Sequence, residues 1–158
     1  MLWSDQDLFR PEQMLTANVN YNVAPPRAVK GKAWTMLDSG SQPNVANCKK
    51  VFPHLQVQES EGQRRGLQYK GADGTLIPNE GECHVVHREN NGDTFKVTVQ
   101  HAQVHCPILS MSELVSRDCV ITFHKLGGHI AYPDGRRIRF VAKEGVFFVL
   151  INILDQDF

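Results

Sequence analysis

Short strand-like runs separated by turn residues dominate the chain from residue 66 onward. Phe95, Val97 and Val99 alternate with polar residues, which predicts a strand with one buried face. Similar runs are found at residues 67–69, 76–77, 81–87, 120–123, 129–132, 138–141 and 146–153. Turn signals separate them at residues 71–74, 90–93, 127–128, 133–135 and 144–145, where glycine, proline, asparagine and aspartate cluster. The pattern predicts a mostly-β domain.

The sequence predicts one helix and marks the residue at which it begins. Pro107, Ile108 and Leu109 resemble a short buried strand, and Ser110-x-x-Glu113 matches the capping box that opens a helix. The expectation is therefore one short helix after a strand.

Length and charge restrict the class of protein. The chain has 158 residues, enough for one domain with a real core. Seventeen basic residues balance seventeen acidic ones, so the net charge is zero. This argues against a mainly electrostatic binder of nucleic acid or of a membrane surface, and it permits self-association.

The four cysteines and the length of the apolar runs indicate in which cellular compartment the protein is expected. The cysteines are scattered without a Cys-x-x-Cys pattern, so we interpret them as reduced thiols of an intracellular, cytoplasmic protein. The N-terminal residues do not have the form of a secretory signal. The longest apolar run, residues 146–151, is too short to cross a bilayer.

The stretch from Trp34 to Ser41 carries the main chemical hypothesis. Apolar residues lead into Asp38, and Ser39 and Gly40 follow at once. A carboxylate at the end of a buried strand is costly unless it is paired or used, and the glycine lets another chain approach closely. The simpler interpretation is a strand that ends in an Asp-Ser-Gly turn, where the aspartate caps its own loop.

Three features then follow in a fixed order: the Asp38 stretch, a hairpin with a glycine-bearing tip at 70–74, and the Ile108-Leu109-Ser110 element. Over roughly residues 33–150 this set resembles the retropepsin-like aspartic proteases, in particular those of copia-type retrotransposon polyproteins. The residues 71–81 resemble the flap of retrotransposon members. Two positions depart from the usual pattern: Ser41 stands where alanine is most frequent, and Ser110 stands where a glycine usually follows the two aliphatic residues.

The resemblance implies a fold and a site. The fold would be a retropepsin-like closed β-barrel or sandwich protomer with one short helix and a C-terminal β-hairpin extension. The catalytic residues would be Asp38, Ser39 and Gly40. The substrate-binding residues of the active-site loop and flap would be Ser41, Lys70, Gly71, Ala72, Asp73 and Gly74. No metal or other cofactor is implied.

Because the chain contains one Asp-Ser-Gly, the resemblance implies a homodimer in which each chain supplies one Asp38. Its substrate would be an extended peptide or a polyprotein, without nucleic acid or membrane as partner. The protein would be located in the cytoplasm, either free or within a virus-like particle.

The expected organisation has three parts: an N-terminal arm or linker at 1–30, a protease core at 31–123, and a C-terminal β extension at 124–158. The extension is either an appended hairpin unit, which we favour, or part of the same domain.

Two alternatives remain open. A catalytically silent domain of the same fold could serve dimerisation or peptide binding. The pairs Cys83-His84 and His105-Cys106, with His87 and His101 nearby, could belong to a small zinc-binding β domain, although their spacings match no common zinc pattern.

Overall fold

The structure, a computed structural model, describes residues 23–71, 73–88 and 94–152. Within these ranges the chain forms eleven strands and three short helices. The strands are β1 (Lys32–Asp38), β2 (Asn44–Ala46), β3 (Gln68–Lys70), β4 (Leu76–Pro78), β5 (Glu82–Arg88), β6 (Thr94–His101), β7 (Ile108–Ser110), β8 (Val120–His124), β9 (Gly127–Ala131), β10 (Arg137–Lys143) and β11 (Val146–Asn152). The helices are α2 (Cys48–Val51), α3 (Glu61–Arg64) and α4 (Met111–Ser116).

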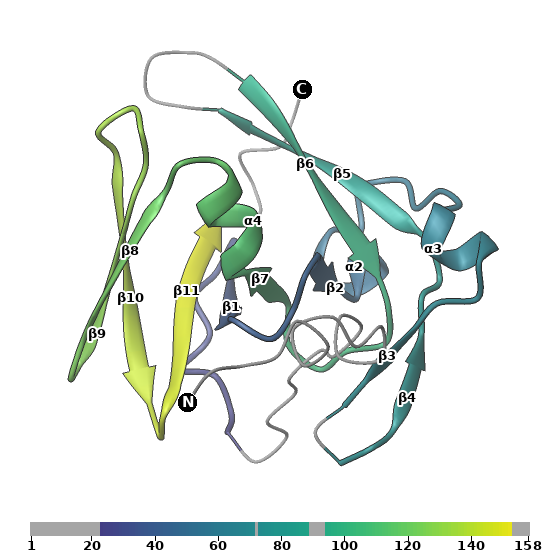
Figure 1. Cartoon of the computed structure of the whole chain (residues 1–158), viewed down its shortest axis with the longest axis horizontal. Coiled ribbons are helices and arrows are strands. Elements are labelled where there is room, and N and C mark those ends of the chain that lie inside the picture. The colour runs from purple at the N-terminus through teal and green to yellow at the C-terminus, as the bar shows by residue number, and fades with distance from the viewer. Residues whose placement is uncertain (1–22, 72, 89–93, 153–158) are drawn as a thin grey trace, which may run out of the picture.

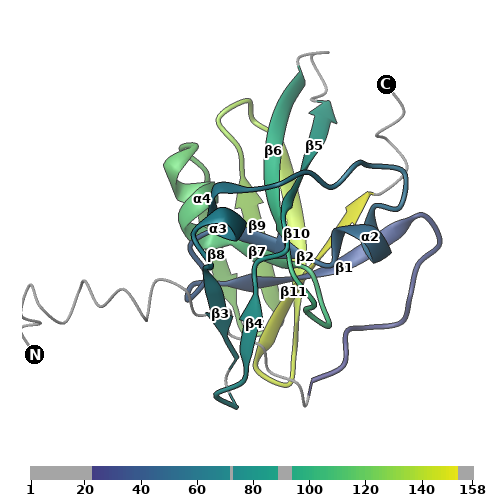
Figure 2. The same cartoon turned by 90° about the vertical axis from the view of Figure 1, so that its right-hand side faces the viewer.

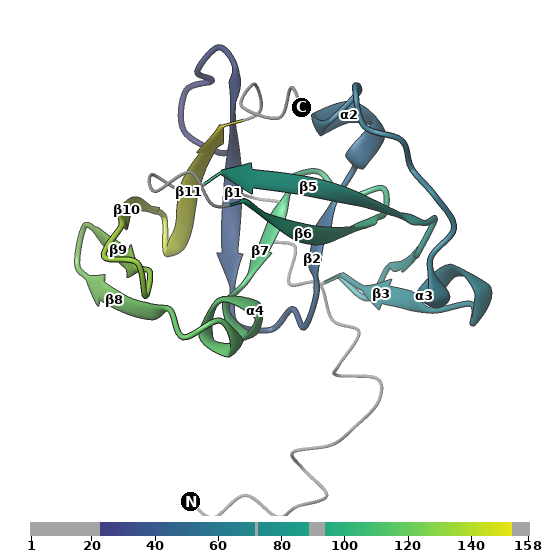
Figure 3. The ribbon, with the colours of Figure 1, turned by 90° about the horizontal axis from the view of Figure 1, so that it is seen from above.

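Nine strands form one sheet in the order β5-β6-β2-β7-β1-β11-β10-β9-β8, and β3 and β4 form a separate hairpin. The hairpin lies beside α3 at one end of the molecule (Figures 1 and 2), and β8–β10 lie at the other end (Figures 1 and 3). Seen from above, β5 and β6 cross over β1, β7 and β2, so the large sheet is strongly coiled (Figure 3).

The centre of the sheet is built from β2, β7 and β1. Strand β7 pairs in parallel with β1 and antiparallel with β2, so it lies between them. Strands at the centre of a covered sheet are apolar on both faces. Accordingly Met36 and Leu37 are both buried, although their side chains point to opposite faces. Leu37 packs with Leu114 of α4, whereas Val45 and Ile108 pack with the hairpin.

The last four strands form an antiparallel meander that continues the same sheet. Strand β11 pairs with β1 from Lys32↔Asn152 to Met36↔Phe148. The phenyl rings of Phe123, Phe140 and Phe147 pack edge to face, with centroids 4.9–5.7 Å apart. Gly128 lies in the row between Phe123 and Phe140, and a Cβ there would come within 2.5 Å of the Phe140 ring.

The mostly-β expectation is confirmed, and the helix capped by Ser110 is present. Where one short helix is expected, the structure also has α2 and α3, each of four residues. The sheet order ends at β5 and β8, and within the described residues no ladder joins these two strands. The expected boundary at 123/124 falls at the end of β8, inside the meander.

Two local features add to the sequence pattern. The runs at 76–77 and 81–87 belong to separate strands, because β4 ends at Pro78 and Gly81, with φ +128°, separates it from β5. Residues 44–46 lie outside the expected strand-like runs, yet they form the fully buried strand β2. Residues 1–22 of the expected N-terminal arm and the turn at 90–93 lie outside the described residues. None of the described helices has the length and apolar character needed to cross a membrane.

Candidate functional site

Asp38 is the last residue of β1, and only 5% of its surface is exposed. Its Oδ1 accepts a hydrogen bond from the Gly40 N–H over 2.7 Å. The next two residues, Ser39 and Gly40, are exposed. The structure therefore places a buried carboxyl group directly beside an open stretch of backbone, which is the arrangement the sequence predicts.

Ser110 lies opposite Asp38 in the parallel ladder between β1 and β7. Its hydroxyl group is within donating distance of the carbonyl oxygens of Ser41 (2.7 Å) and Gln42 (2.8 Å). Its backbone N–H donates to Asn44 Oδ1 over 2.8 Å. Ser110 therefore fastens the loop after Asp38 to β7.

The same serine begins helix α4, because its Oγ also accepts from the Glu113 N–H over 3.2 Å. A glycine, which is usual at this point in the retropepsin-like pattern that the sequence resembles, has no hydroxyl group to offer either contact. Ser41 is itself buried, and its Oγ donates to the Pro43 carbonyl over 2.6 Å. Ser41 and Ser110 thus belong to one hydrogen-bonded arrangement, in which Ser110 of β7 holds the loop that contains Ser41.

The hairpin tip, residues 71–75, is held by short-range hydrogen bonds. Gly71 N–H donates to Thr75 O over 2.8 Å, and Gly74 N–H donates to Gly71 O over 2.9 Å. Gly74 has φ +85°, as expected for a glycine in a tight turn. Asp73 Oδ1 accepts from Thr75 N–H, and this backbone hydrogen bond lowers the pKa of the Asp73 carboxyl group. Ala72 lies outside the described residues.

The base of the hairpin rests on the strands around Asp38. Tyr69 and Ile77 face each other in the β3–β4 ladder and are buried against Val45 of β2 and Ile108 of β7. Lys70, on the other face, is exposed. Within the described residues, the structure thus brings Asp38, Ser41 and Ser110 together, and it connects the hairpin to them through its base.

Asn79 anchors the hairpin, and sequence reasoning did not single it out. It is 6% exposed and uses its whole amide group. Its Oδ1 accepts from Ser60 Oγ (2.7 Å) and Gly81 N–H (3.0 Å), and its Nδ2 donates to Tyr69 Oη (3.0 Å) and Gln100 Oε1 (2.8 Å). The one local signal is the run Pro78-Asn79-Glu80-Gly81, which has the composition of a turn.

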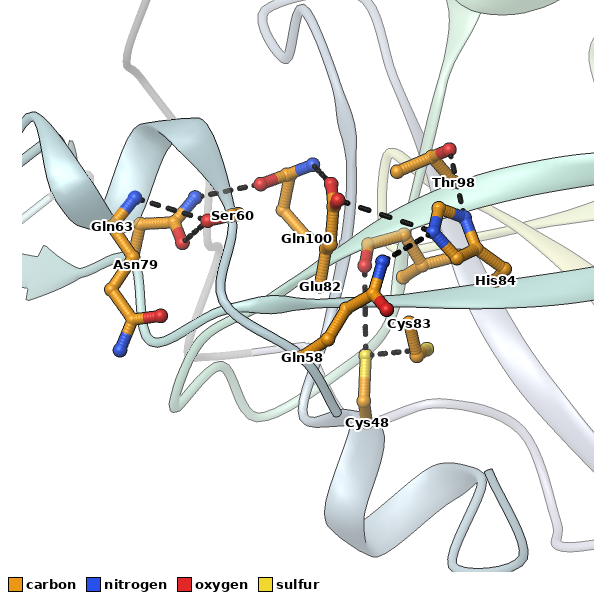
Figure 4. A network of polar contacts seen from close by, with 11 residues as sticks. Cys48, Gln58, Ser60, Gln63, Asn79, Glu82, Cys83, His84, Thr98 and Gln100 are labelled. Carbon is orange, nitrogen blue, oxygen red and sulfur yellow. Dashed lines mark hydrogen bonds and ion pairs between the residues drawn. The ribbon is translucent and has the colours of Figure 1, made fainter. Parts of the chain in front are cut away.

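The network extends from Asn79 along the sheet (Figure 4). Gln100 Nε2 donates to Glu82 Oε2 over 3.1 Å, and Glu82 Oε1 lies 4.0 Å from His84 Nε2. At the other end, burial raises the pKa of Tyr69 to about 12, and the hydrogen bond from Asn79 offsets part of this shift. The hairpin base is thus tied to β5 and β6 by polar side chains as well as by apolar contact.

The cysteine and histidine residues of the zinc alternative are dispersed. Cys83 is buried against Cys48, while His84, on the opposite face of β5, contacts Gln58 and Thr98. Cys106 donates to the Trp34 carbonyl, and burial raises the pKa of its thiol to about 11. In the part of the chain that the structure describes, no three potential ligands converge on a metal position.

His101, another residue of that alternative, is fully buried at the end of β6. Its Nδ1 accepts from the Cys48 N–H over 2.9 Å, so the proton of the neutral ring is on Nε2. Nε2 lies 4.0 Å from Glu80 Oε2. This histidine holds the start of α2 in place.

Comparison with known proteins adds no relative: no family model, no curated protein and no solved structure matches this chain.

Proposed function

We propose that the chain is one protomer of a retropepsin-like aspartic endopeptidase that cleaves a polyprotein, as in copia-type retrotransposons. The observation that carries the proposal is the Asp38 carboxyl group, buried at the end of a central strand beside the exposed Ser39 and Gly40. A buried carboxyl group with an open backbone next to it suits chemistry on a bound peptide chain.

The reaction needs two carboxyl groups. Asp38 of one chain and Asp38 of a second copy would meet at a two-fold axis, where they share one proton because like charges a few ångströms apart do not both ionise. The ionised carboxylate takes a proton from a water molecule, whose oxygen attacks the scissile carbonyl carbon. The protonated carboxyl group donates to the carbonyl oxygen, and the tetrahedral intermediate collapses when the amide nitrogen takes up a proton.

The neighbouring residues would supply position and cover. Ser39 would bond across the axis and hold the two loops together, and Gly40 would leave its backbone open to the substrate. The hairpin from Lys70 to Gly74 would close over an extended peptide and exclude water. The hydrogen bonds from Ser110 to the loop after Asp38 support the catalytic role of Asp38, because a catalytic carboxyl group has to stay within about 0.5 Å of its working position.

A catalytically silent, peptide-binding or dimerising domain is the second candidate. It is favoured by the hydrogen bond from Gly40 N–H to Asp38 Oδ1, since a carboxylate that caps its own turn has a purely structural use.

Substitution of Asp38 separates the two candidates. Asp38→Asn keeps an oxygen that accepts from Gly40 N–H, so the turn survives, but it removes the acid–base group. We expect peptide cleavage to fall by at least about 10³-fold. The matched control is Asp134→Asn, because Asp134 Oδ1 also accepts from a backbone N–H two residues ahead, that of Arg136. Measurement uses self-cleavage of a purified precursor and a library of peptide substrates.

Mixing the two forms tests the shared dyad. Excess Asp38→Asn chain, added to wild-type chain, should suppress cleavage, because mixed dimers hold one working carboxyl group. Equal cleavage by wild type and Asp38→Asn would exclude the endopeptidase, and activity of a strictly monomeric species would exclude the shared site.

A further inference from the structure

Cys48 and Cys83 lie side by side in the interior, and the proteolytic proposal does not use them. Both side chains are fully buried. The Cys83 thiol donates to Cys48 Sγ over 2.9 Å, and Cys48 is also within donating distance of the Val99 carbonyl. Figure 4 shows the two sulfur atoms facing each other between the start of α2 and strand β5.

The other two cysteines have different surroundings. Cys106 donates to a backbone carbonyl, that of Trp34, and Cys119 packs among apolar residues beside Leu114. The two residues therefore provide internal controls for thiol reactivity in the same chain.

The geometry is close to that of a covalent link. A disulfide bond joins sulfur atoms about 2.0 Å apart, so the two atoms need to approach by less than about 1 Å. The two residues are separated by 35 positions, and Cys48 opens a helix of only four residues that ends at Val51.

The two thiols are also unequal. The hydrogen bond between them lowers the pKa of Cys83, and the same bond together with burial raises the pKa of Cys48. The first proton is therefore lost from Cys83, and the Cys48 thiol remains to donate to the thiolate formed. In a bond between the two sulfur atoms, we accordingly assign Cys83 as the attacking thiol and Cys48 as the resolving thiol.

The positions of Cys48 and Cys83 in the chain determine which segment a bond between them would close. Cys48 lies just before, and Cys83 just after, the segment that contains α3 and the β3–β4 hairpin. The bridge between Gln58 and Glu82, with N···O distances of 2.8 and 2.9 Å, already holds the part of the segment before α3 against β5. A bond between the two sulfur atoms would close the hairpin-bearing segment into a ring.

We propose that Cys48 and Cys83 form a reversible disulfide bond that fastens the hairpin-bearing segment to the sheet, with a peroxide as oxidant and a dithiol as reductant. The Cys83 thiolate attacks one oxygen of hydrogen peroxide and becomes a sulfenic acid, while the other oxygen leaves as water after taking a proton. The Cys48 sulfur then attacks the Cys83 sulfur, the S–S bond forms, and the hydroxyl group leaves as a second water. Two thiols and one peroxide thus give one disulfide and two waters.

The full-length chain tests this directly. After treatment with hydrogen peroxide, thiol titration in denaturant should find two thiols in place of four, and dithiothreitol should restore them. A non-reducing peptide map should contain the Cys48 peptide joined to the Cys83 peptide, at the mass of the two minus two hydrogens. The oxidised chain should melt roughly 5 °C or more above the reduced chain.

Variants sharpen the test. The double variant Cys106→Ser/Cys119→Ser keeps the pair, so peroxide should still remove both of its remaining thiols. In Cys48→Ala, Cys83 has no resolving thiol, so it should be oxidised to sulfinic or sulfonic acid or form a disulfide between two chains. The peptide map of the wild-type chain stands without any variant, so a poorly folding variant does not block the test. Four surviving thiols, links between chains, or added oxygen without the joined peptide would overturn the proposal. None of these results depends on whether the chain cleaves peptides.

Discussion

The strand junction around Asp38 and the β3–β4 hairpin are held in place in different ways. At the junction, Ser110 bonds to Ser41 in the loop and to Asn44 at the start of β2, and these partners are 69 and 66 residues away in the sequence. In the hairpin, the tip bonds connect residues within a span of five. The base is tied to the sheet by the Asn79 amide, which bonds to Gln100, and by apolar contact of Tyr69 and Ile77 with β2 and β7. The junction is therefore fixed by partners distant in the sequence, whereas the hairpin tip depends on a local turn and only the hairpin base is held by the sheet.

This difference suits the proposed roles. A carboxyl group that does chemistry needs a rigid support, and a cover that opens and closes needs a small number of attachment points. The following predictions test whether the two regions respond separately to substitution, and they run from the largest expected effect to the smallest.

Removal of the hairpin anchor should have the largest effect on stability. Asn79→Ala leaves Ser60, Tyr69 and Gln100 without their shared partner, so we expect a loss of about 3 kcal/mol in the free energy of unfolding. Hydrogen exchange should accelerate most in residues 68–78. Chemical denaturation and exchange mass spectrometry measure both.

The matched control is Gln103→Ala, which removes another side-chain amide with two contacts, to Asn47 and Glu80, but an exposed one. It should change stability by less than about 0.5 kcal/mol. If hydrogen exchange in Asn79→Ala rises equally around Asp38 and in the hairpin, the two regions are one cooperative unit. That result would contradict their separate response to substitution.

Ser110→Ala should weaken the junction by about 2 kcal/mol, because it removes both the helix cap of α4 and the bond to the loop at 41–42. Exchange should rise around residues 38–42 and in α4, with the hairpin nearly unchanged. Ser112→Ala is the control, since this exposed serine reaches the Ser110 hydroxyl group at 2.9 Å and the Gln42 carbonyl at 3.3 Å, whereas the cap contact to Glu113 belongs to Ser110. Equal effects of the two substitutions would contradict the assigned role of Ser110.

The smallest effect concerns pH. Tyr69 has a pKa near 12 in the folded chain against 10.0 for the free side chain, because burial disfavours the phenolate. Its contribution to stability is therefore complete below pH 10 and declines as the pH rises toward 12. We expect wild type to lose about 1–2 kcal/mol more than Tyr69→Phe over this window. Parallel unfolding curves of the two proteins between pH 9 and 12 give the difference, and identical slopes would show that Tyr69 is not responsible.

The sequence by itself determined the features that depend on neighbours along the chain. The alternation of residues 95–99 marked a strand, and Asp73-Gly74 marked a turn, because both signals arise within a few residues. The capping box at Ser110 and Glu113 gave the start of α4 for the same reason. The buried end of β1 at Asp38 also followed from its apolar approach.

Only the tertiary structure decided which of these pieces meet. The second role of Ser110, the anchor at Asn79, the contact of Cys48 with Cys83 and the pairing of β11 with β1 all connect residues that are distant in sequence. A serine, an asparagine or a cysteine has the same local pattern whether its partner is water or a buried side chain. Its partner is set when the strands pack together, because burial then requires each polar group to find a hydrogen bond within the interior.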